Sequence, residues 1–235
     1  MLVIAAGVGA FAWWFLKDDA PAEVDITQAA AQVDEAPATT AATDATDAAT
    51  TGIDGTWSVD TSIGEFSYED STGTFVGFRV AEELSGLGST TAVGRTPDVT
   101  GTLTVDSTTV TAVTIEADMT SITTNDNRRN DKVQDALETG QYPTATFVLT
   151  EPIELGDIAE SATIDVQATG ELTIHGVTQT VTIPLQAQLV DDTIVVVGSL
   201  DIVFADYGVE VPTAPIVVSA EDHGPLELQL FFTRS

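Results

Sequence analysis

The side chains best suited to acid–base or metal chemistry in this sequence are two histidines, His175 and His223. A zinc site needs several ligands at close spacing, and a general base needs a reacting group within hydrogen-bond reach. Neither histidine has a second histidine at ligand spacing, and the chain contains no cysteine. Both are therefore interpreted as turn residues, and no metal site is predicted.

A polar cluster that includes Asn125-Asp126-Asn127 and Asn130-Asp131 resembles part of a calcium loop. A calcium loop also needs a central glycine and a closing glutamate, and both are missing at loop spacing. Capping of a helix by Asn125 or Asp126 explains the cluster better. The sequence also lacks a nucleophile elbow, a glycine-rich phosphate loop and a zinc-binding H-E-x-x-H helix. No catalytic residues are predicted.

Arg128 and Arg129 stand out because the chain contains only five arginines. One interpretation is pairing with nearby aspartates at a helix start, which contributes little to stability when it is exposed. The other is an electropositive rim beside an opening, because a guanidinium group suits a phosphate or carbonyl headgroup.

The chain is strongly acidic, with 37 acidic against 7 basic residues and a formal net charge of -30. Such a surface repels phosphate backbones, so nucleic acid is not a predicted partner. It also suits solubility in a saline medium, where salt screens the self-repulsion of the chain. The absence of cysteine excludes disulfides and thiolate chemistry.

Residues 1–17, MLVIAAGVGAFAWWFLK, form an apolar run that ends in Trp13, Trp14 and Lys17. As a helix, residues 1–16 would span roughly 24 Å, against a hydrocarbon core of about 30 Å. Tryptophan and lysine at the end of the run are typical of the membrane interface. The segment is predicted to be an N-terminal hydrophobic helix that anchors the protein in the cell membrane, with the domain outside the cytoplasm.

A cleaved signal peptide is the alternative, with Ala20-Pro21-Ala22 near its cleavage site, and would give a secreted protein. Residues 18–54 are rich in alanine, threonine and aspartate. This composition offers few large side chains to offset the entropy cost of ordering, so a flexible, disordered linker is predicted there. Residues 55–235 are predicted to form the folded domain.

From residue 55 onward the sequence consists of short runs in which apolar and polar residues alternate, which is typical of antiparallel strands with one buried face. The predicted strands are Thr56–Asp60, Thr74–Leu84, Val99–Asp106, Val110–Ile122, Thr144–Thr150, Ala162–His175, Thr178–Val190, Thr193–Phe204 and Pro225–Thr233. The longest runs reach about twice the typical strand length, and such strands twist strongly and commonly close into a barrel. Periodicity leaves open whether the apolar face is a filled core or the wall of a cavity.

One stretch, residues 123–143, lacks the alternating pattern. Val133, Ala136 and Leu137 share one helical face, and Pro143 follows shortly after. A short helix over an opening of the β domain is predicted.

Several segments, in order along the chain, resemble the YceI-like family of polyisoprenoid-binding, lipocalin-like bacterial proteins. They are Trp57–Asp60, Thr74–Leu84, Met119–Val133, Tyr142–Phe147, Glu171–Leu185 and Asp206–Val209. The chain departs from the family pattern at Asn130 and Gln179, which weakens the idea of a charged rim, and at Pro184. A bulge is predicted at Pro184, because proline cannot donate to a β ladder.

The resemblance implies an all-β fold, an eight-stranded antiparallel lipocalin-like barrel with one short helix. It also implies that an isoprenoid lipid, of the quinone or polyprenyl phosphate class, lies in an apolar channel for carriage or storage. The predicted channel residues are Val113, Ile115, Met119, Phe147, Leu172, Ile174, Val181, Ile183 and Phe204. Arg128 or Arg129 would meet the headgroup at the channel mouth.

No cofactor is expected apart from the lipid, and pairing of two barrels into a homodimer is left open. The main alternative is a non-catalytic interaction or scaffold protein of the cell envelope, in which the barrel is filled and the acidic surface meets a cationic partner. An enzyme acting on the lipid is a third alternative, but no nucleophile, base and orienting group can be assembled for it.

Overall fold

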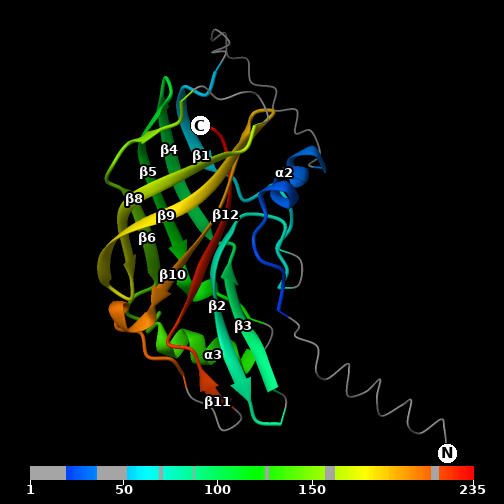
Figure 1. Cartoon of the computed structure of the whole chain (residues 1–235), viewed down its shortest axis with the longest axis vertical. Helices are drawn as coiled ribbons and strands as arrows, with labels where there is room; N and C mark the ends of the chain where they lie inside the picture. The colour runs from blue at the N-terminus through cyan, green and yellow to red at the C-terminus, as the bar shows by residue number, and fades with distance from the viewer. Residues whose placement is uncertain are drawn as a thin grey trace, which may run out of the picture.

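The computed structural model describes residues 20–35, 52–68, 71–86, 88–124, 127–156, 162–212 and 217–235. Strands dominate these ranges, together with the short helices α2 (Ile26–Glu35) and α3 (Asn127–Ala136) (Figure 1). The turns η1 (Met119–Ser121) and η2 (Phe204–Tyr207) are 3-10 helices. The predicted hydrophobic helix over residues 1–17 lies outside the described residues, and within them no helix combines the length and apolarity that a membrane crossing requires.

The strands agree with the alternating runs of the sequence wherever those runs are long. Their bounds are β1 (Gly55–Val59), β2 (Phe75–Leu84), β3 (Gly88–Thr96), β4 (Val99–Asp106), β5 (Thr109–Asp118), β6 (Thr144–Leu149), β7 (Ile153–Glu154), β8 (Ile164–Ile174), β9 (Val177–Val190), β10 (Thr193–Val203), β11 (Val217–Ala220) and β12 (His223–Arg234). The sequence did not predict β3, whose early residues are Gly, Ser and Thr, or the very short β7 and β11.

Eight of the strands close into a ring. Each strand pairs antiparallel with the next in the order β1, β4, β5, β6, β8, β9, β10 and β12, and β12 returns to β1. The return pairing joins Trp57, Ser58 and Val59 to the last residues of β12. The predicted eight-stranded antiparallel barrel is therefore confirmed.

One part of the barrel wall is built differently, because β12 changes partner along its length. Its C-terminal end pairs with β1, whereas residues 226–229 pair with residues 75–78 of β2. The β2–β3 hairpin and β11 extend the wall toward the end of the barrel that α3 covers (Figure 1). The outer edge of β3 forms one isolated bridge, between Arg95 and Thr123.

The predicted helix over the opening is α3. Asn130 accepts hydrogen bonds through its side-chain Oδ1 from the backbone N–H and the hydroxyl of Thr124, at 2.6 and 2.8 Å. The predicted caps, Asn125 and Asp126, lie outside the described residues. Gln134 donates to the carbonyl oxygens of Met119 and Thr120, which fixes the helix against the end of β5.

The predicted bulge at Pro184 is absent. The register between β8 and β9 runs without a shift through the pair Gln167–Pro184. Proline has no N–H to donate, and the effect is on the pairing with β10. The ladder between β9 and β10 stops at the pair Leu185–Gly198, next to Pro184. Pro184 therefore marks the point where these two strands stop pairing.

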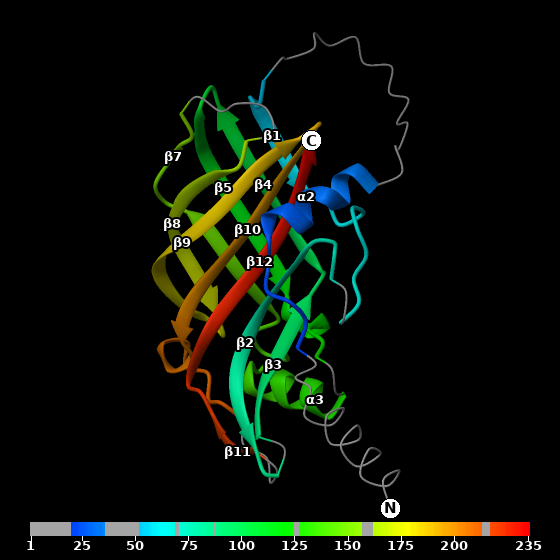
Figure 2. The ribbon, with the colours of Figure 1, turned by 45° about the vertical axis from the view of Figure 1, so that its right-hand side comes forward.

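Residues 20–35 differ from the predicted flexible linker. They approach the barrel as an extended segment and then form α2, which lies against the outside of β9 and β10 (Figure 2). Ile26 and Ala29 are buried there against Val195, Val197 and Phe231. This apolar contact offsets the entropy cost of ordering the segment. Residues 36–51 of the predicted linker lie outside the described residues.

Candidate functional site

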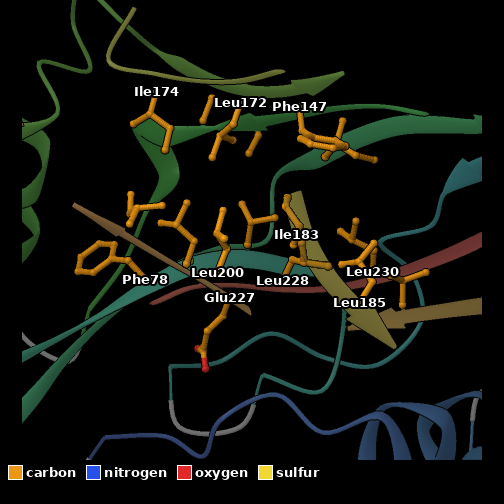
Figure 3. A pocket seen from close by; sticks show the side chains of 18 of the residues that line it. Phe78, Phe147, Leu172, Ile174, Ile183, Leu185, Leu200, Glu227, Leu228 and Leu230 are labelled. Carbon is orange, nitrogen blue, oxygen red and sulfur yellow. The ribbon is translucent and has the colours of Figure 1, made fainter. Parts of the chain in front are cut away.

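The barrel encloses a cavity of about 840 Å³. Its wall is mostly aliphatic and aromatic, and the polar side chains that border it are few. Figure 3 shows Ile174, Leu172 and Phe147 on one side of the cavity, facing Phe78, Leu200 and other apolar residues across it. The volume lies within the usual range of about 300–1,000 Å³ for small-molecule sites.

The structure places nearly all of the predicted channel residues on the cavity wall. Those that line it are Val113, Ile115, Met119, Phe147, Leu172, Ile174, Ile183 and Phe204. Val181 does not line the cavity and packs instead against the cluster that contains Phe204 and Tyr207. The turn η2 lies beside this part of β9, so alternation along the strand did not distinguish Val181 from Ile183.

Sequence reasoning missed the contribution of the β2–β3 hairpin to the cavity. Phe78 and Val80 of β2 and Ala92 of β3 line the wall, as do Leu226 and Leu228 of β12. The alternation of Phe78, Val80 and the intervening Arg79 was visible in the sequence. It indicated an inward face but not that this face belongs to the cavity.

Two cavity-lining aromatic rings lie directly over glycines. A Cβ atom placed on Gly170 would lie 2.5 Å from Cζ of Phe147, and one placed on Gly94 would lie 2.5 Å from Cε1 of Phe78. Real Cβ atoms do not come this close to other heavy atoms, so each glycine leaves the space that its ring occupies. These glycines therefore set how far Phe147 and Phe78 project into the cavity.

Gly170→Ala is expected to lower the free energy of unfolding by about 1–3 kcal/mol, because the added methyl overpacks the wall. It would meet the ring of Phe147 and the backbone carbonyl of Val148. Urea unfolding measures the change. Gly140→Ala is the matched control, because a Cβ there meets no atom within 4 Å. If the two variants were equally stable, the Phe147 ring would not require the space that Gly170 leaves.

Charged side chains gather where α3 covers the end of the cavity. Arg129 and Lys132 of α3 and Glu82 of β2 all border the cavity. Nη2 of Arg129 lies 3.1 Å from Oε2 of Glu82. Arg129 therefore pairs with a residue from a distant strand, in addition to any neighbour on its own helix. The side chain of Arg128 lies outside the described residues.

Lys132 and Glu82 were not predicted as rim residues. Lys132 could have been found, because it lies three residues after Arg129 and so on the same side of the helix. Glu82 could not, because nothing in the local sequence links β2 to α3.

His175 occupies the turn between β8 and β9, as predicted, with a positive φ of 51°. Its Nδ1 lies 3.2 Å from the carbonyl oxygen of Tyr207, and its Nε2 lies 3.4 Å from Oε2 of Glu138. Its ring also makes an edge contact with Tyr142. His175 therefore joins three turns at the helix-covered end of the barrel and does not line the cavity wall.

His223 lies at the start of β12, beside Asp222 and Glu221, and all three side chains are exposed. Nδ1 of His223 lies 3.0 Å from Oδ1 of Asp222, and this hydrogen bond raises the pKa of the imidazole. The three residues could offer ligand atoms to a metal ion. They do not line the cavity, however, and exposed acidic groups of this kind are common without an ion.

Among curated proteins, the chain is similar to Protein YceI of Escherichia coli O17:K52:H18 (strain UMN026), with 36% identity over 120 residues. It is 35% identical to Protein YceI of Shigella boydii serotype 4 over the same length. The matched segment covers 49% of this chain and 56% of the relative in both cases. The match therefore spans little more than half the length of these relatives.

Among solved structures, the chain resembles a polyisoprenoid binding domain from Saccharophagus degradans implicated in plant cell wall breakdown. The TM-score is 0.57 at 18% identity, and the alignment covers 76% of this chain and 98% of that one. It also resembles BcnA of Burkholderia cenocepacia, with a TM-score of 0.51 at 21% identity, covering 66% of this chain and 95% of that one. These likenesses show a common fold.

The family comparison covers most of the barrel, although β1 lies before the matched residues. The YceI-like domain matches residues 68–232, which include every described strand from β2 to β11 and nearly all of β12. The order of the motifs, the closed barrel and this match agree with one another, and the chain belongs to the YceI-like family.

Proposed function

We propose that the barrel is a non-catalytic binding protein that holds a long-chain isoprenoid lipid in its cavity. The observation that carries this proposal is an apolar space of about 840 Å³ inside a closed barrel. Close-packed protein interiors leave few voids larger than a water molecule. A space of this size therefore favours a carrier over the alternative scaffold with a filled barrel.

The chemistry of the wall suits a hydrocarbon chain. Each methylene that moves from water into the barrel contributes roughly 0.8 kcal/mol, so several prenyl units bind without directional contacts. The polyisoprenoid binding domain of Saccharophagus degradans, which shares the fold, supports this ligand class. Carriage and storage of the lipid both fit such a site.

Comparison of native and denaturing mass spectra of the purified protein tests the proposal. A lipid-sized mass that is present under native conditions and lost on denaturation is expected, and solvent extraction then identifies the lipid. The native spectrum also reports whether two barrels form a homodimer. A protein of bare polypeptide mass that takes up no added prenyl lipid would contradict the carrier function.

The end of the cavity at α3 is the proposed headgroup site. Three of the seven basic residues of the chain, Arg128, Arg129 and Lys132, lie on this one short helix. In a chain with a net charge of -30, this is a marked local concentration of positive charge. A guanidinium group and an ammonium group there would bind a phosphate more strongly than a neutral quinone ring.

Arg129→Ala and Lys132→Ala are each expected to weaken binding of a polyprenyl phosphate about 10- to 100-fold, the loss of one charge-assisted contact. Binding of a quinone with a similar tail should change much less. Fluorescence titration with both ligands measures the difference, and Arg128→Ala is tested in the same way. Arg234→Ala is the control, because that guanidinium lies over the Trp57 ring and does not border the cavity. Equal losses for both ligands would remove the headgroup role.

The proposal includes a membrane anchor in residues 1–17 and a barrel outside the cytoplasm. It is supported by the apolar run and by Trp13, Trp14 and Lys17 at its end. The intact mass of the protein recovered from its own membranes tests the anchor, since residues 1–19 are retained in an anchored protein. A mature chain that begins near Ala20 would support the secreted alternative. Protease added to intact cells should digest the barrel if it lies outside.

A further inference from the structure

Three charged side chains are buried together on the outer face of the barrel wall, where β2, β3 and β12 meet. Nε of Arg79 lies 2.5 Å from Oε1 of Glu227, and Nη2 of Arg95 lies 3.0 Å from Oε2 of the same carboxylate. The side chains of these residues are 9%, 2% and 3% exposed, respectively. Two guanidinium groups thus share one carboxylate, which leaves an excess positive charge that needs further polar partners.

Those partners come from the chain before α2. Nη2 of Arg79 donates to the carbonyl oxygens of Pro21 and Ala22, at 2.7 and 2.5 Å. Nη2 of Arg95 donates to the same Ala22 oxygen at 2.8 Å. We call residues 20–35 the N-terminal arm. Its first residues thus supply backbone acceptors to the Nη2 groups of both buried arginines.

The second half of the arm binds a different part of the wall. In α2, Ala29 is 1% exposed and packs with Ile26 against Val195 and Val197 of β10 and Phe231 of β12 (Figure 2). The arm therefore bridges two regions. Its extended part is bound to Arg79 of β2 and Arg95 of β3, and its helix packs on β10 and on the C-terminal part of β12.

The wall beneath the cluster is also the wall of the cavity. Glu227 and Leu228 both border the cavity, and Figure 3 shows the carboxylate of Glu227 pointing away from it. Arg79 alternates in the same way with Phe78 and Val80, which line the cavity. Any movement of β2 away from β12 would therefore break the ionic cluster and open the cavity together.

The β2–β3 hairpin has few backbone attachments to the rest of the barrel among the described residues. In the eight-stranded ring it pairs only with β12, through residues 75–78 of β2, and the outer edge of β3 makes the single bridge to Thr123. Residues 82–84 of β2 also pair with β11, but β11 pairs with no other described strand. The long ladders elsewhere are more extensive, such as the one that joins β8 and β9 along all of β8. The position of the hairpin against the ring therefore depends strongly on side-chain contacts.

We propose that the N-terminal arm is a latch that holds the β2–β3 hairpin against β12 and closes the cavity on that side. When the arm detaches, Arg79 and Arg95 lose the carbonyl partners, the hairpin swings out, and a prenyl chain passes through the wall. The arm then sets how fast the lipid exchanges. This inference rests on the proposed function only for the identity of the ligand that passes through the wall.

Ala29→Glu tests the latch, because it puts a charge into the apolar contact beneath α2 without altering the barrel. Thr27→Glu is the matched control, since Thr27 is exposed on the same helix. Hydrogen–deuterium exchange is measured on the full-length protein without ligand. In Ala29→Glu, exchange within residues 75–96 is expected to rise at least about tenfold, with β8 and β9 unchanged. In Thr27→Glu neither region should change.

The exchange of residues 26–35 reports whether the arm has detached, and the double variant Ile26→Asp with Ala29→Glu is used if a single charge leaves it protected. A detached arm with a fully protected hairpin would overturn the proposal. An equal rise across the whole barrel would also overturn it, because the arm would then only add general stability.

A second measurement follows the cargo. Transfer of a fluorescent geranylgeranyl alcohol from the protein to phosphatidylcholine vesicles is expected to be at least about tenfold faster for Ala29→Glu than for Thr27→Glu. Unchanged transfer despite a loosened hairpin would exclude the hairpin as the exchange route. If the probe does not bind at all, the proposed function fails, while the exchange result still decides whether the arm holds the hairpin.

Discussion

Ile174→Trp is expected to reduce lipid binding more than about 100-fold while the barrel remains folded. Ile174 is on the cavity wall in β8, beside Leu172 and across from Phe78. An indole at this position projects into space that the prenyl chain would occupy. Overpacking a filled core costs about 1–3 kcal/mol, but here the open cavity receives most of the added volume.

The control is Glu171→Trp, three residues earlier on the same strand, where the side chain is exposed on the outer face. It adds an indole of the same size and should leave lipid content unchanged. Mass spectrometry of the extracted lipid measures binding, and thermal unfolding checks that both variants fold. If Ile174→Trp retained the wild-type amount of lipid, the cavity would not be the binding site.

The long strands could be predicted because their inward and outward sides differ clearly. Residues of β8 alternate between a more buried and a more exposed side along its full length, and the sequence shows the same alternation. The predicted bounds of β4 agree with the structure. Strand β3 has no such contrast, because its buried half contains glycine and arginine, and its partner β2 was needed to recognise it.

The N-terminal arm was not predicted, because its own composition is typical of disorder. The strand that it covers, β10, nevertheless has a sequence pattern that indicates an outer layer. Residues Ile194 to Val197 are all apolar, so both faces of β10 must be covered. Ile194 and Val196 line the cavity, whereas Val195 and Val197 face outward beneath α2. A consecutive apolar run in an otherwise alternating barrel therefore indicates an outer layer, which the low-complexity segment supplies.

Most of the cavity wall followed from periodicity, but the existence of a cavity did not. A filled barrel and a hollow one have the same inward-facing pattern, and the difference depends on how far side chains project. Phe147 lies over Gly170 and Phe78 lies over Gly94, and these contacts hold the rings close to the wall. Such pairs come from neighbouring strands and can be recognised only once the register is known.

Glu227→Gln is expected to give the largest loss of stability, about 3–5 kcal/mol in the free energy of unfolding, because it leaves two buried guanidinium groups without a counter-charge. Arg79 and Arg95 both depend on this carboxylate, and Arg95 also lies over the Phe75 ring at 4.2 Å. Urea unfolding measures the loss. Glu171→Gln, an exposed position, should change stability by less than about 0.5 kcal/mol. Similar values for the two variants would contradict the ionic cluster.

A triple variant separates stability from latching. Replacing Arg79 and Arg95 by methionine and Glu227 by leucine removes the buried charges together, and apolar replacement of a buried ion pair is often neutral or stabilising. The barrel of this variant should therefore unfold at a urea concentration close to that of the wild type. The carbonyl oxygens of Pro21 and Ala22 would nevertheless lose their donors, so hydrogen exchange in the hairpin should rise as it does in Ala29→Glu. A stable triple variant whose hairpin stays protected would show that α2 alone holds the wall closed.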